Sequence, residues 1–471
     1  MSDPAGSLRG KAALVLGLGV HGGGAGVVRF LVEHGAVVTV TDLRPPEKLE
    51  TTLASLSILP VLYVLGEHRE ADVRSADVIV RNPAVPRESP WLDLARRHGV
   101  PVLMEMNLFW AHCPAPIVAI TGSKGKSTTT AWLGHTWRLS RPDTVVAGNL
   151  RVSALEALPL IGPDTPVVLE LSSWQLESFG DTRIGPHVSC VTNIAPDHLN
   201  RYSDMADYAS SKREIYRYQR PEDIAVLCWD DPVVRGFAAD CPAQVRWFGL
   251  EEAPSEGAHV SAGWIVLRGA EASPLLPVGE LGLRGPHNVL NALATAALAD
   301  ACGLPAEQIA EGLRTFKGLP DRMEPVAYIN GVAYINDTTS TTPVSTIAAL
   351  RTIEGPIALI AGGASKNVGF ADLAPEICAR VSYLALLEGS ATDELQAAVN
   401  GCSGKLDTEV YGELQSAVSA AAERAGPGWT VLLSPACASF GMFDNEFQRG
   451  EQFRAAVREL GSKGQGALHG R

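Results

Sequence analysis

Short apolar runs recur along the chain and alternate with longer stretches in which apolar positions follow a helical spacing. The runs are rich in Val, Ile and Leu, as is typical of parallel strands buried on both faces of a sheet. The alternation predicts an α/β fold in which helices cover parallel sheets. The expected strands lie at 12–16, 37–42, 77–80, 117–121, 167–172, 188–193, 224–228, 357–360, 384–387 and 431–433.

At 471 residues the chain is too long for a single hydrophobic core, and its pattern predicts three domains. Residues 1–112 are expected to form a Rossmann-like domain. Residues 113–318, whose first apolar run leads into Gly122-Ser-Lys-Gly-Lys-Ser127 and a helix-like stretch, are expected to form a central parallel-sheet domain of the P-loop ATPase type. Residues 319–471 are expected to form a second Rossmann-like α/β domain.

Three local features refine this prediction. The stretch 251–280 is rich in turn residues and is expected to be a peripheral β excursion of the central domain. Asn330-Gly331 lies between two short alternating runs, which predicts a β-hairpin. The last residues, 461–471, are expected to form a frayed tail.

Composition narrows the classes of function. The net charge of −13 argues against a nucleic-acid partner, because phosphate binding needs a basic face. The longest apolar runs are too short to cross a membrane. The eight cysteines are scattered without a CxxC pair, which favours reduced thiols over a disulfide framework. We therefore expect a cytoplasmic protein that is not inserted in a membrane.

The segment from Ile117 to Thr130 predicts a strand, a phosphate-binding loop and a helix. Its first glycine is Gly122, since Ile120 stands where the usual pattern places one, so the loop is a shortened variant. Backbone N–H groups at a helix N-terminus attract phosphate oxygens, and Lys126 adds a positive charge. We therefore expect this loop to bind the phosphates of ATP. The alternative is an ordinary glycine turn that binds no ligand. The expected ATP-binding residues are Gly122, Ser123, Lys124, Gly125, Lys126, Ser127 and Thr128.

A second glycine-rich turn follows the first expected strand. Gly17-Leu-Gly19-Val-His-Gly22 fits the GxGxxG pattern, and Asp42 lies twenty residues beyond its last glycine, where a ribose-binding acid is expected. From the residues alone, an NAD site and a turn without a ligand both remain open. The loop Arg81–Pro86 also follows a strand, at the sheet edge where α/β proteins bind ligands.

Three further side chains are candidates for a metal site. Glu170 ends an apolar strand, and a carboxylate there suits Mg²⁺, although a solvated strand-end carboxylate is an equal alternative. Asp197-His198 follows the next strand and is also well placed for a ligand. Lys212 lies in a segment with helical character, where the alternative is a surface lysine.

Together these blocks resemble the Mur ligases of bacterial cell-wall synthesis. The resemblance runs essentially from end to end and rests on several motifs in a fixed order. These are Gly17–Gly19, Gly122–Ser127, Leu169–Ser173, Asp197-His198, Gly285–Asn288 with Asn291, Gly318–Arg322, Ile335–Asp337 and Ser434–Ser439.

The resemblance implies a role for each block. The first domain would hold a uridine diphosphate substrate instead of NAD, through Gly19, Val20, His21, Asp42, Arg44 and Asn82, with Asn149, Ser172 and Gln175 nearer the reacting carboxylate. Asn288, Asn291, Arg322 and Asp337 would complete the ATP site. Ser127 and Glu170 would hold Mg²⁺ and His198 a second Mg²⁺, with a carbamylated Lys212 also among the metal ligands. The incoming glutamate would meet Thr341, Lys366, Ser439, Phe440 and Phe447.

The activity implied by the resemblance is that of an ATP-dependent amide ligase, acting as a monomer. It would add D-glutamate to UDP-N-acetylmuramoyl-L-alanine through an acyl phosphate, with Lys126, Glu170, His198 and Lys212 as the catalytic residues. The chain departs from the family at two places in the expected pocket for the incoming amino acid. Thr339 stands where the family has a lysine, and Glu446-Phe447 reverses the family's usual Phe-Glu order. The identity of the added amino acid therefore stays open. The alternatives are an L-glutamate-adding or folylpolyglutamate-type ligase and, in another class, an NAD-dependent dehydrogenase.

Overall fold

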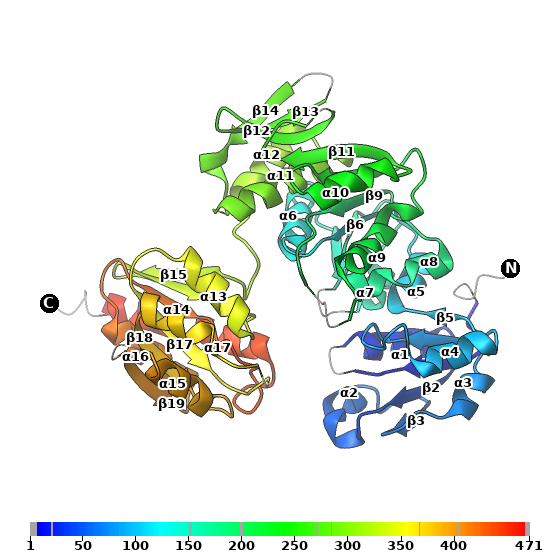
Figure 1. Ribbon diagram of the computed structural model, residues 1–471, viewed down its shortest axis with the longest axis horizontal. Helices are drawn as coiled ribbons and strands as arrows, with labels where there is room; N and C mark the ends of the chain where they lie inside the picture. Colours follow the sequence, from blue (N-terminus) through cyan, green and yellow to red (C-terminus); the bar gives the residue numbers. More distant parts are fainter. Residues whose placement is uncertain are drawn as a thin grey trace. The chain divides into compact units, whose positions relative to one another are not determined.

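The computed structural model describes residues 7–19, 22–149, 153–197, 201–253, 255–269, 272–283, 285–366, 368–402 and 406–466. The chain forms two compact units, Met1–Phe316 and Lys317–Arg471. They contain three α/β sheets, two in the first unit and one in the second (Figure 1). The predicted α/β class with parallel sheets is therefore confirmed. The predicted domain boundaries at 112/113 and 318/319 remain predictions.

The first sheet is parallel throughout and has five strands. Their order is β3 (Val61–Leu65), β2 (Val37–Asp42), β1 (Ala12–Leu16), β4 (Val78–Arg81) and β5 (Val102–Leu103). The direction in which successive strands are added reverses between β1 and β4, and ligands of α/β proteins bind at the carboxyl edge of such a reversal. Alternate residues of β1 face opposite sides, where they pack with α3 (Glu70–Ser75) and α4 (Pro90–Arg97) or with α1 (Gly23–Glu33) and α5 (Glu105–His112).

The second sheet has nine strands. Their order is β14 (Ala272–Pro277), β13 (Trp264–Arg268), β12 (Gly257–Ser261), β11 (Gln244–Gly249), β10 (Ile224–Cys228), β9 (Val188–Val191), β6 (Ile117–Thr121), β8 (Val167–Glu170) and β7 (Val145–Gly148). Only β13 and β14 run antiparallel to their neighbours, so the predicted peripheral β excursion is confirmed. One hydrophobic cluster joins this sheet to one face of the first, which is why both belong to one compact unit.

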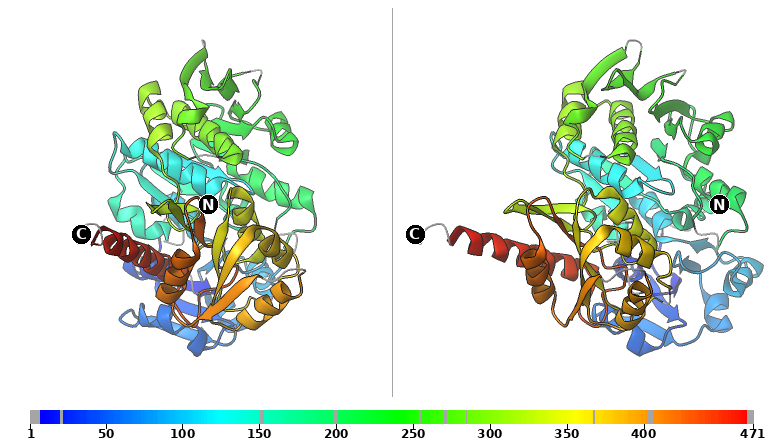
Figure 2. Two further views of the ribbon diagram at one scale, coloured as in Figure 1. Left: turned by 90° about the vertical axis from the view of Figure 1, so that its left-hand side faces the viewer. Right: turned by 60° about the vertical axis from the view of Figure 1, so that its left-hand side comes forward.

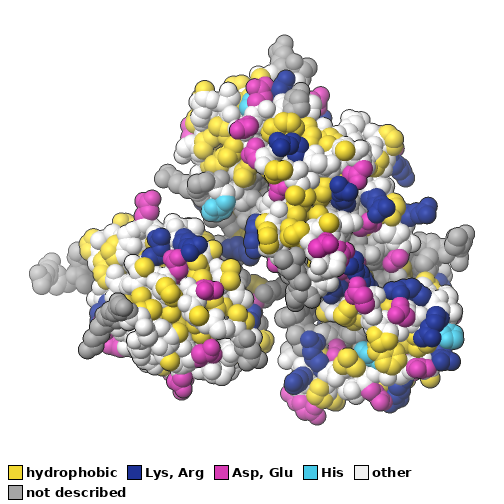
Figure 3. Space-filling view, viewed as in Figure 1, with side chains coloured by type: hydrophobic (Ala, Val, Ile, Leu, Met, Phe, Trp, Pro, Cys, Tyr) yellow, Lys and Arg dark blue, Asp and Glu magenta, His cyan; other side chains and the backbone are white. Residues whose placement is uncertain are grey.

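Four helices of the central part bear on the site. They are α6 (Lys126–Arg138), α7 (Ser173–Leu176), α9 (Met205–Arg217) and α11 (Pro286–Ala301), and α12 (Ala306–Thr315) packs with α6 and α11. Among the described residues, no helix is both long and apolar enough to cross a membrane. Side chains of both charges lie over the first unit on the face drawn in Figure 3.

The sheet of the second unit has six strands. Their order is β15 (Glu324–Ile329), β16 (Val332–Asn336), β20 (Thr430–Leu433), β17 (Ile357–Gly362), β18 (Val381–Leu387) and β19 (Asp407–Tyr411). Only β15 is antiparallel to its neighbour, and it forms the predicted hairpin with β16 around Asn330-Gly331. One face packs with α13 (Pro343–Thr352), α14 (Leu373–Arg380) and α15 (Thr392–Asn400), and the other with α16 (Leu414–Arg424) and α17 (Glu446–Gly466).

The prediction of a frayed tail over 461–471 is wrong for residues 461–466. Helix α17 continues to Gly466, and Figure 2 shows it as one red helix. Leu460 packs against the hydrophobic cluster on that face of the sheet, and this contact lies next to Gly461, where the sequence suggested that order would end. Residues 467–471 lie outside the described part of the chain.

Candidate functional site

The phosphate loop joins β6 to α6 and depends on two glycines. Gly122 has φ +145° and Gly125 has φ +84°, a region that L side chains rarely adopt. A Cβ on Gly122 would lie 1.8 Å from Thr192 Oγ1, and one on Gly125 would lie 2.3 Å from Asn291 Oδ1. A side chain at either position would strain the backbone and displace Thr192 or Asn291.

The residues that follow β9 hold this loop. Ser123 N–H donates to the carbonyl of Asn193 at 2.9 Å, and Lys124 N–H donates to Asn193 Oδ1 at 2.9 Å. Thr192 Oγ1 donates to the Lys124 carbonyl at 2.6 Å. The sequence did not reveal Thr192 and Asn193 as residues that support the loop. Strands β6 and β9 are adjacent in the sheet, but two other strands lie between them in the sequence.

Lys126 begins α6, and its Nζ donates to the Ser123 carbonyl at 3.1 Å. Ser127 and Thr128 follow in the first turn of the same helix, with partly exposed side chains. Asn288 and Asn291 come from α11, which packs along α6, and they are bonded to each other at 3.1 Å. The structure thus brings the predicted asparagines beside Gly125, although they lie far along the chain from it.

Glu170 ends β8 with 1% of its surface exposed. Its Oε1 accepts a hydrogen bond from Asn149 Nδ2 at 3.0 Å. Its Oε2 is buried and has no hydrogen-bond partner within the described part of the chain. A buried carboxylate oxygen without a donor is costly, and a bound cation is one way to satisfy it. Glu170 therefore has a donor atom that fits Mg²⁺.

Lys212 lies on α9 and is 1% exposed, so the alternative of a surface lysine is wrong. Its Nζ donates to the Gly122 carbonyl at 2.9 Å. Burial, reinforced by the positive charge of Lys126, holds the pKa of Lys212 well below its ordinary value, against the opposing effect of Asp197 and Glu170. The neutral amine is therefore more populated at a given pH than in an ordinary lysine.

The predicted residues Val20, His21 and His198 lie outside the described residues. Within the described ranges, no cluster of three or more His, Cys, Asp or Glu side chains could hold a metal ion. For a metal at this place, the described chain therefore offers Glu170 and Ser127, beside the phosphates of a nucleotide.

A cavity of about 980 Å³ opens at the carboxyl edge of the first sheet, beside the reversal between β1 and β4. It reaches from the N-terminal sheet to the central one, as the lining residues Trp91 and Trp174 show. Six of the residues predicted for the UDP substrate line it: Gly19, Asp42, Arg44, Asn82, Asn149 and Gln175. Ser172 is not among the lining residues, since its side chain caps α7 together with Gln175.

Asp42 holds the glycine turn at this cavity. Its carboxylate accepts hydrogen bonds from the backbone N–H of Leu18 at 2.9 Å, Gly19 at 3.1 Å and Arg44 at 2.8 Å. Three backbone donors on one carboxylate fix the shape of the turn. Asp42 thus shapes the cavity as well as lining it.

Glu105 lines the same cavity and was missed in the sequence, since a carboxylate that begins a helix has no distinctive pattern. Its Oε1 accepts from Ser153 Oγ at 2.5 Å and from the Ala154 N–H at 2.9 Å. Burial raises the pKa of Glu105 to about 7, although these hydrogen bonds act in the opposite direction.

The residues predicted from the second unit gather at one edge of its sheet. Asp337, Lys366 and Ser439 follow β16, β17 and β20, which are neighbours in the sheet. Lys366 Nζ donates to Thr341 Oγ1 at 2.7 Å. A bridge between Ala364 and Ala438 holds the segments that lead to Lys366 and Ser439 together.

The remaining residues of this edge differ in exposure. Asp337 is buried and accepts from Ser434 Oγ at 2.8 Å; burial raises its pKa, and the nearby charge of Arg322 partly opposes the shift. Phe440 and Phe447 are 60% and 40% exposed. Thr339, at the position of the expected lysine, donates its hydroxyl to the Asp321 carbonyl at 2.7 Å.

Comparison with protein families accounts for most of the chain. Residues 11–104 match the MurD-like N-terminal domain of Mur ligases, residues 120–299 the Mur ligase middle domain, and residues 321–437 the glutamate ligase domain. The chain belongs to the Mur ligase family. This replaces the dehydrogenase alternative, and the N-terminal match also disfavours a folylpolyglutamate-type ligase.

Individual relatives agree with this assignment. The chain is 48% identical over 465 residues to a UDP-N-acetylmuramoylalanine–D-glutamate ligase of Roseiflexus sp. (strain RS-1), covering 96% of this chain and 99% of the relative. A ligase of the same name from Symbiobacterium thermophilum is 36% identical, with coverages of 96% and 98%. The MurF ligase of Thermotoga maritima, solved in complex with ADP, shares the fold with a TM-score of 0.54 at 17% identity, with coverages of 98% and 100%.

Proposed function

We propose that the chain is a UDP-N-acetylmuramoylalanine–D-glutamate ligase that uses ATP to form the amide bond. One observation carries this proposal: Asn149, which lines the large cavity, donates to Glu170, the candidate metal ligand beside the phosphate loop. An anionic substrate in the cavity would therefore present its far end where ATP phosphates are held. Full-length similarity to ligases of this name supports the same conclusion.

In this proposal, the alanyl carboxylate of UDP-N-acetylmuramoyl-L-alanine attacks the γ-phosphorus of ATP. An acyl phosphate and ADP result. The amine of D-glutamate then attacks the acyl carbon, and the tetrahedral intermediate collapses with loss of phosphate. Such a reaction depends mainly on positioning the reactants and neutralising phosphate charge.

The residues of the first unit divide this work. The loop from Gly122 to Thr128 would bind ATP phosphates through backbone N–H groups and the Lys126 ammonium. Asn288 and Asn291, at the other side of Gly125, would contact the adenine. Ser127 and Glu170 would hold Mg²⁺, which when bound neutralises phosphate charge. His198 would ligate a second Mg²⁺, and a carbamylated Lys212 would supply oxygen ligands.

The UDP end of the substrate would lie against the glycine turn and the Asn82 loop. Gly19, Asp42 and Arg44, which line the cavity, would recognise it together with Val20 and His21, which follow Gly19 in the sequence and lie outside the described residues. Ser172 and Gln175 would lie nearer the reacting end.

Residues of the second unit would complete the site. Arg322 would contact ATP phosphates and Asp337 the ribose. D-glutamate would be bound by Thr341, Lys366, Ser439, Phe440 and Phe447. These residues all belong to the second compact unit. We further infer that the protein acts as a monomer in the cytoplasm, without nucleic-acid or membrane partners.

The decisive experiment measures phosphate release from ATP with UDP-N-acetylmuramoyl-L-alanine and either D- or L-glutamate. We expect release with D-glutamate at a rate at least about tenfold above that with L-glutamate. Reactions without the UDP substrate serve as the control. Equal rates with both enantiomers would overturn the stereochemical part, and no release with either would overturn the proposal.

A further inference from the structure

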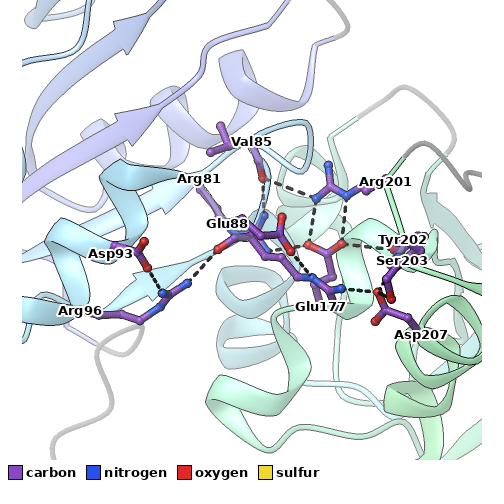
Figure 4. A network of polar contacts seen from close by, with 11 residues as sticks. Arg81, Val85, Glu88, Asp93, Arg96, Glu177, Arg201, Tyr202, Ser203 and Asp207 are labelled. Atoms are coloured by element: carbon purple, nitrogen blue, oxygen red, sulfur yellow. Dashed lines mark hydrogen bonds and ion pairs between the residues drawn. The ribbon is translucent and has the colours of Figure 1, made fainter.

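A buried ion cluster links the two sheets of the first unit. Glu177 lies just after α7, and its carboxylate accepts hydrogen bonds from two arginines (Figure 4). Arg81 lies at the end of β4, and Arg201 lies in the segment beyond β9. The three side chains are 5%, 6% and 11% exposed. Tyr202 also donates its hydroxyl to the Glu177 carboxylate, at 3.2 Å.

Each of the two arginines donates hydrogen bonds from two nitrogens of its guanidinium group. Arg81 NH2 donates to Glu177 Oε2 at 3.0 Å, while its NH1 donates to the carbonyl of Val85 at 2.7 Å. Arg201 donates to both carboxylate oxygens, from Nε at 3.1 Å and from NH2 at 2.9 Å. Its guanidinium carbon also lies 4.4 Å from the centre of the Trp174 ring. Glu177 is therefore the common anchor of two arginines that each touch another group.

Those two other groups line the substrate cavity. Val85 belongs to the loop that carries Asn82, and Trp174 stands beside Gln175. Arg81 and Glu177 themselves line a second cavity of about 1300 Å³. The cluster thus supports two walls of the substrate cavity from behind, one wall from each sheet.

Stability alone is a weak reason for such a cluster. Taking ions out of water costs free energy that the ion pair repays only in part, and apolar residues of similar volume often serve as well. A planar guanidinium that binds a carboxylate, a carbonyl and an aromatic face fixes several groups at defined angles. That property is what a substrate-binding wall requires.

We propose that Glu177, through Arg81 and Arg201, is a positioning residue for the UDP substrate, because it fixes the Val85 loop and the Trp174 ring. The inference rests on the proposed function. Disturbing the cluster affects the binding of the UDP substrate and leaves the binding of ATP unchanged.

The test compares Glu177→Gln and Arg201→Lys with the wild-type chain. Gln keeps the size of the side chain but removes its charge, and Lys keeps the charge but loses the fork and the flat face. For each variant we expect the KM for the UDP substrate to rise about tenfold and the KM for ATP to stay within about twofold. Arg74→Lys is the matched control, since Arg74 pairs with Glu70 on the exposed surface of α3.

A double-mutant cycle isolates the contact with the ring. Calorimetry measures the Kd of the UDP substrate for Arg201→Lys, Trp174→Phe and the double variant, at a temperature where all three are folded. Positioning predicts that the double variant loses less affinity than the product of the single losses. This cycle does not use Glu177→Gln, so it tests the inference even if that variant fails to fold.

Each result has one meaning. Equal increases in both KM values, or a lower Tm with unchanged KM values, would overturn the positioning role. A wild-type chain that neither binds nor turns over the UDP substrate would instead overturn the proposed function.

Discussion

Lys212 is a basic side chain in a place where a free ammonium is poorly tolerated. It is buried behind the phosphate loop, near the positive charge of Lys126, and its pKa lies well below the ordinary value. A neutral amine is a nucleophile and can react with carbon dioxide, whereas an ammonium cannot. The structure thus gives a physical reason for the proposed carbamylation, which replaces an unfavourable charge with oxygens that suit a metal site.

Replacing Lys212 tests this chemistry. We expect Lys212→Ala to lose most activity and formate or acetate to restore part of it, because a small carboxylate can occupy the vacated oxygen positions. Lys212→Arg should stay inactive with or without these anions, since a guanidinium keeps its charge. The measurement is phosphate release at increasing formate, with chloride as the salt control. An arginine variant with wild-type turnover would contradict the carbamylation.

Lys126 belongs to the proposed ATP site and does not line the cavity proposed for the UDP substrate. Its Nζ lies at the phosphate loop, whereas the large cavity is lined by other residues. We expect Lys126→Ala to lower ATP-dependent phosphate release at least about a hundredfold, because a charge at the transferring phosphoryl group is lost. The Kd of the UDP substrate, measured by calorimetry, should stay within about twofold. Loss of UDP-substrate affinity in this variant would show that the two sites are not separate.

At the scale of elements, the turn between β6 and α6 requires glycine at two positions with positive φ. Gly125→Ala places a methyl group 2.3 Å from Asn291 Oδ1 at a positive φ, so it strains the backbone and displaces the Asn291 side chain. We expect the KM for ATP to rise at least about tenfold. Gly236→Ala is the matched control, because that glycine is helical and its Cβ would meet open space. Similar kinetics for the two variants would exclude a special role for the turn.

Burial of Glu105, the first residue of α5, is expected to make the stability of the first unit depend on pH. The pKa of Glu105 is about 7 in the folded chain, against 4.5 for a free side chain. The folded state therefore binds more protons between these values, and this contribution to stability is lost as the pH rises through 7. It amounts to at most about 3 kcal/mol.

Urea unfolding at pH 5 and pH 8 measures this effect. Wild type should lose more stability over this interval than Glu105→Gln, because Gln accepts the same two hydrogen bonds without a charge. Glu222→Gln, at an exposed position, should behave as wild type. The same pH dependence in Glu105→Gln would assign the effect to other groups.

The sequence predicts elements better than it predicts their neighbours. The strands β6, β8, β9 and β10 were predicted because each is a short run of β-branched and apolar residues, and the hairpin because Asn-Gly favours its turn. The support of the loop by Thr192 and Asn193 depends on which strands lie side by side, and one sequence does not specify that. The burial of Lys212 was missed for a similar reason, since the partners of α9 lie far away in the chain.

For the whole molecule, the division after Phe316 separates the predicted substrate-binding residues into two sets. The phosphate loop and the UDP cavity belong to the first unit. Lys366, Thr341 and Ser439 belong to the second, where the carboxyl ends of β17 and β20 bring them together. In the proposed function, the UDP substrate would be bound by residues of the first unit and D-glutamate by residues of the second.

The separation predicts which constants a change in the second unit affects. Lys366→Ala should raise the KM for D-glutamate at least about tenfold, since the ammonium that would pair with a carboxylate of glutamate is lost. The Kd of the UDP substrate should stay within about twofold, because its cavity is lined by residues of the first unit alone. Lys317→Ala, close to the division and outside the predicted glutamate site, is the control. If Lys366→Ala weakened the UDP substrate and left the KM for D-glutamate unchanged, the assignment of glutamate to the second unit would fail.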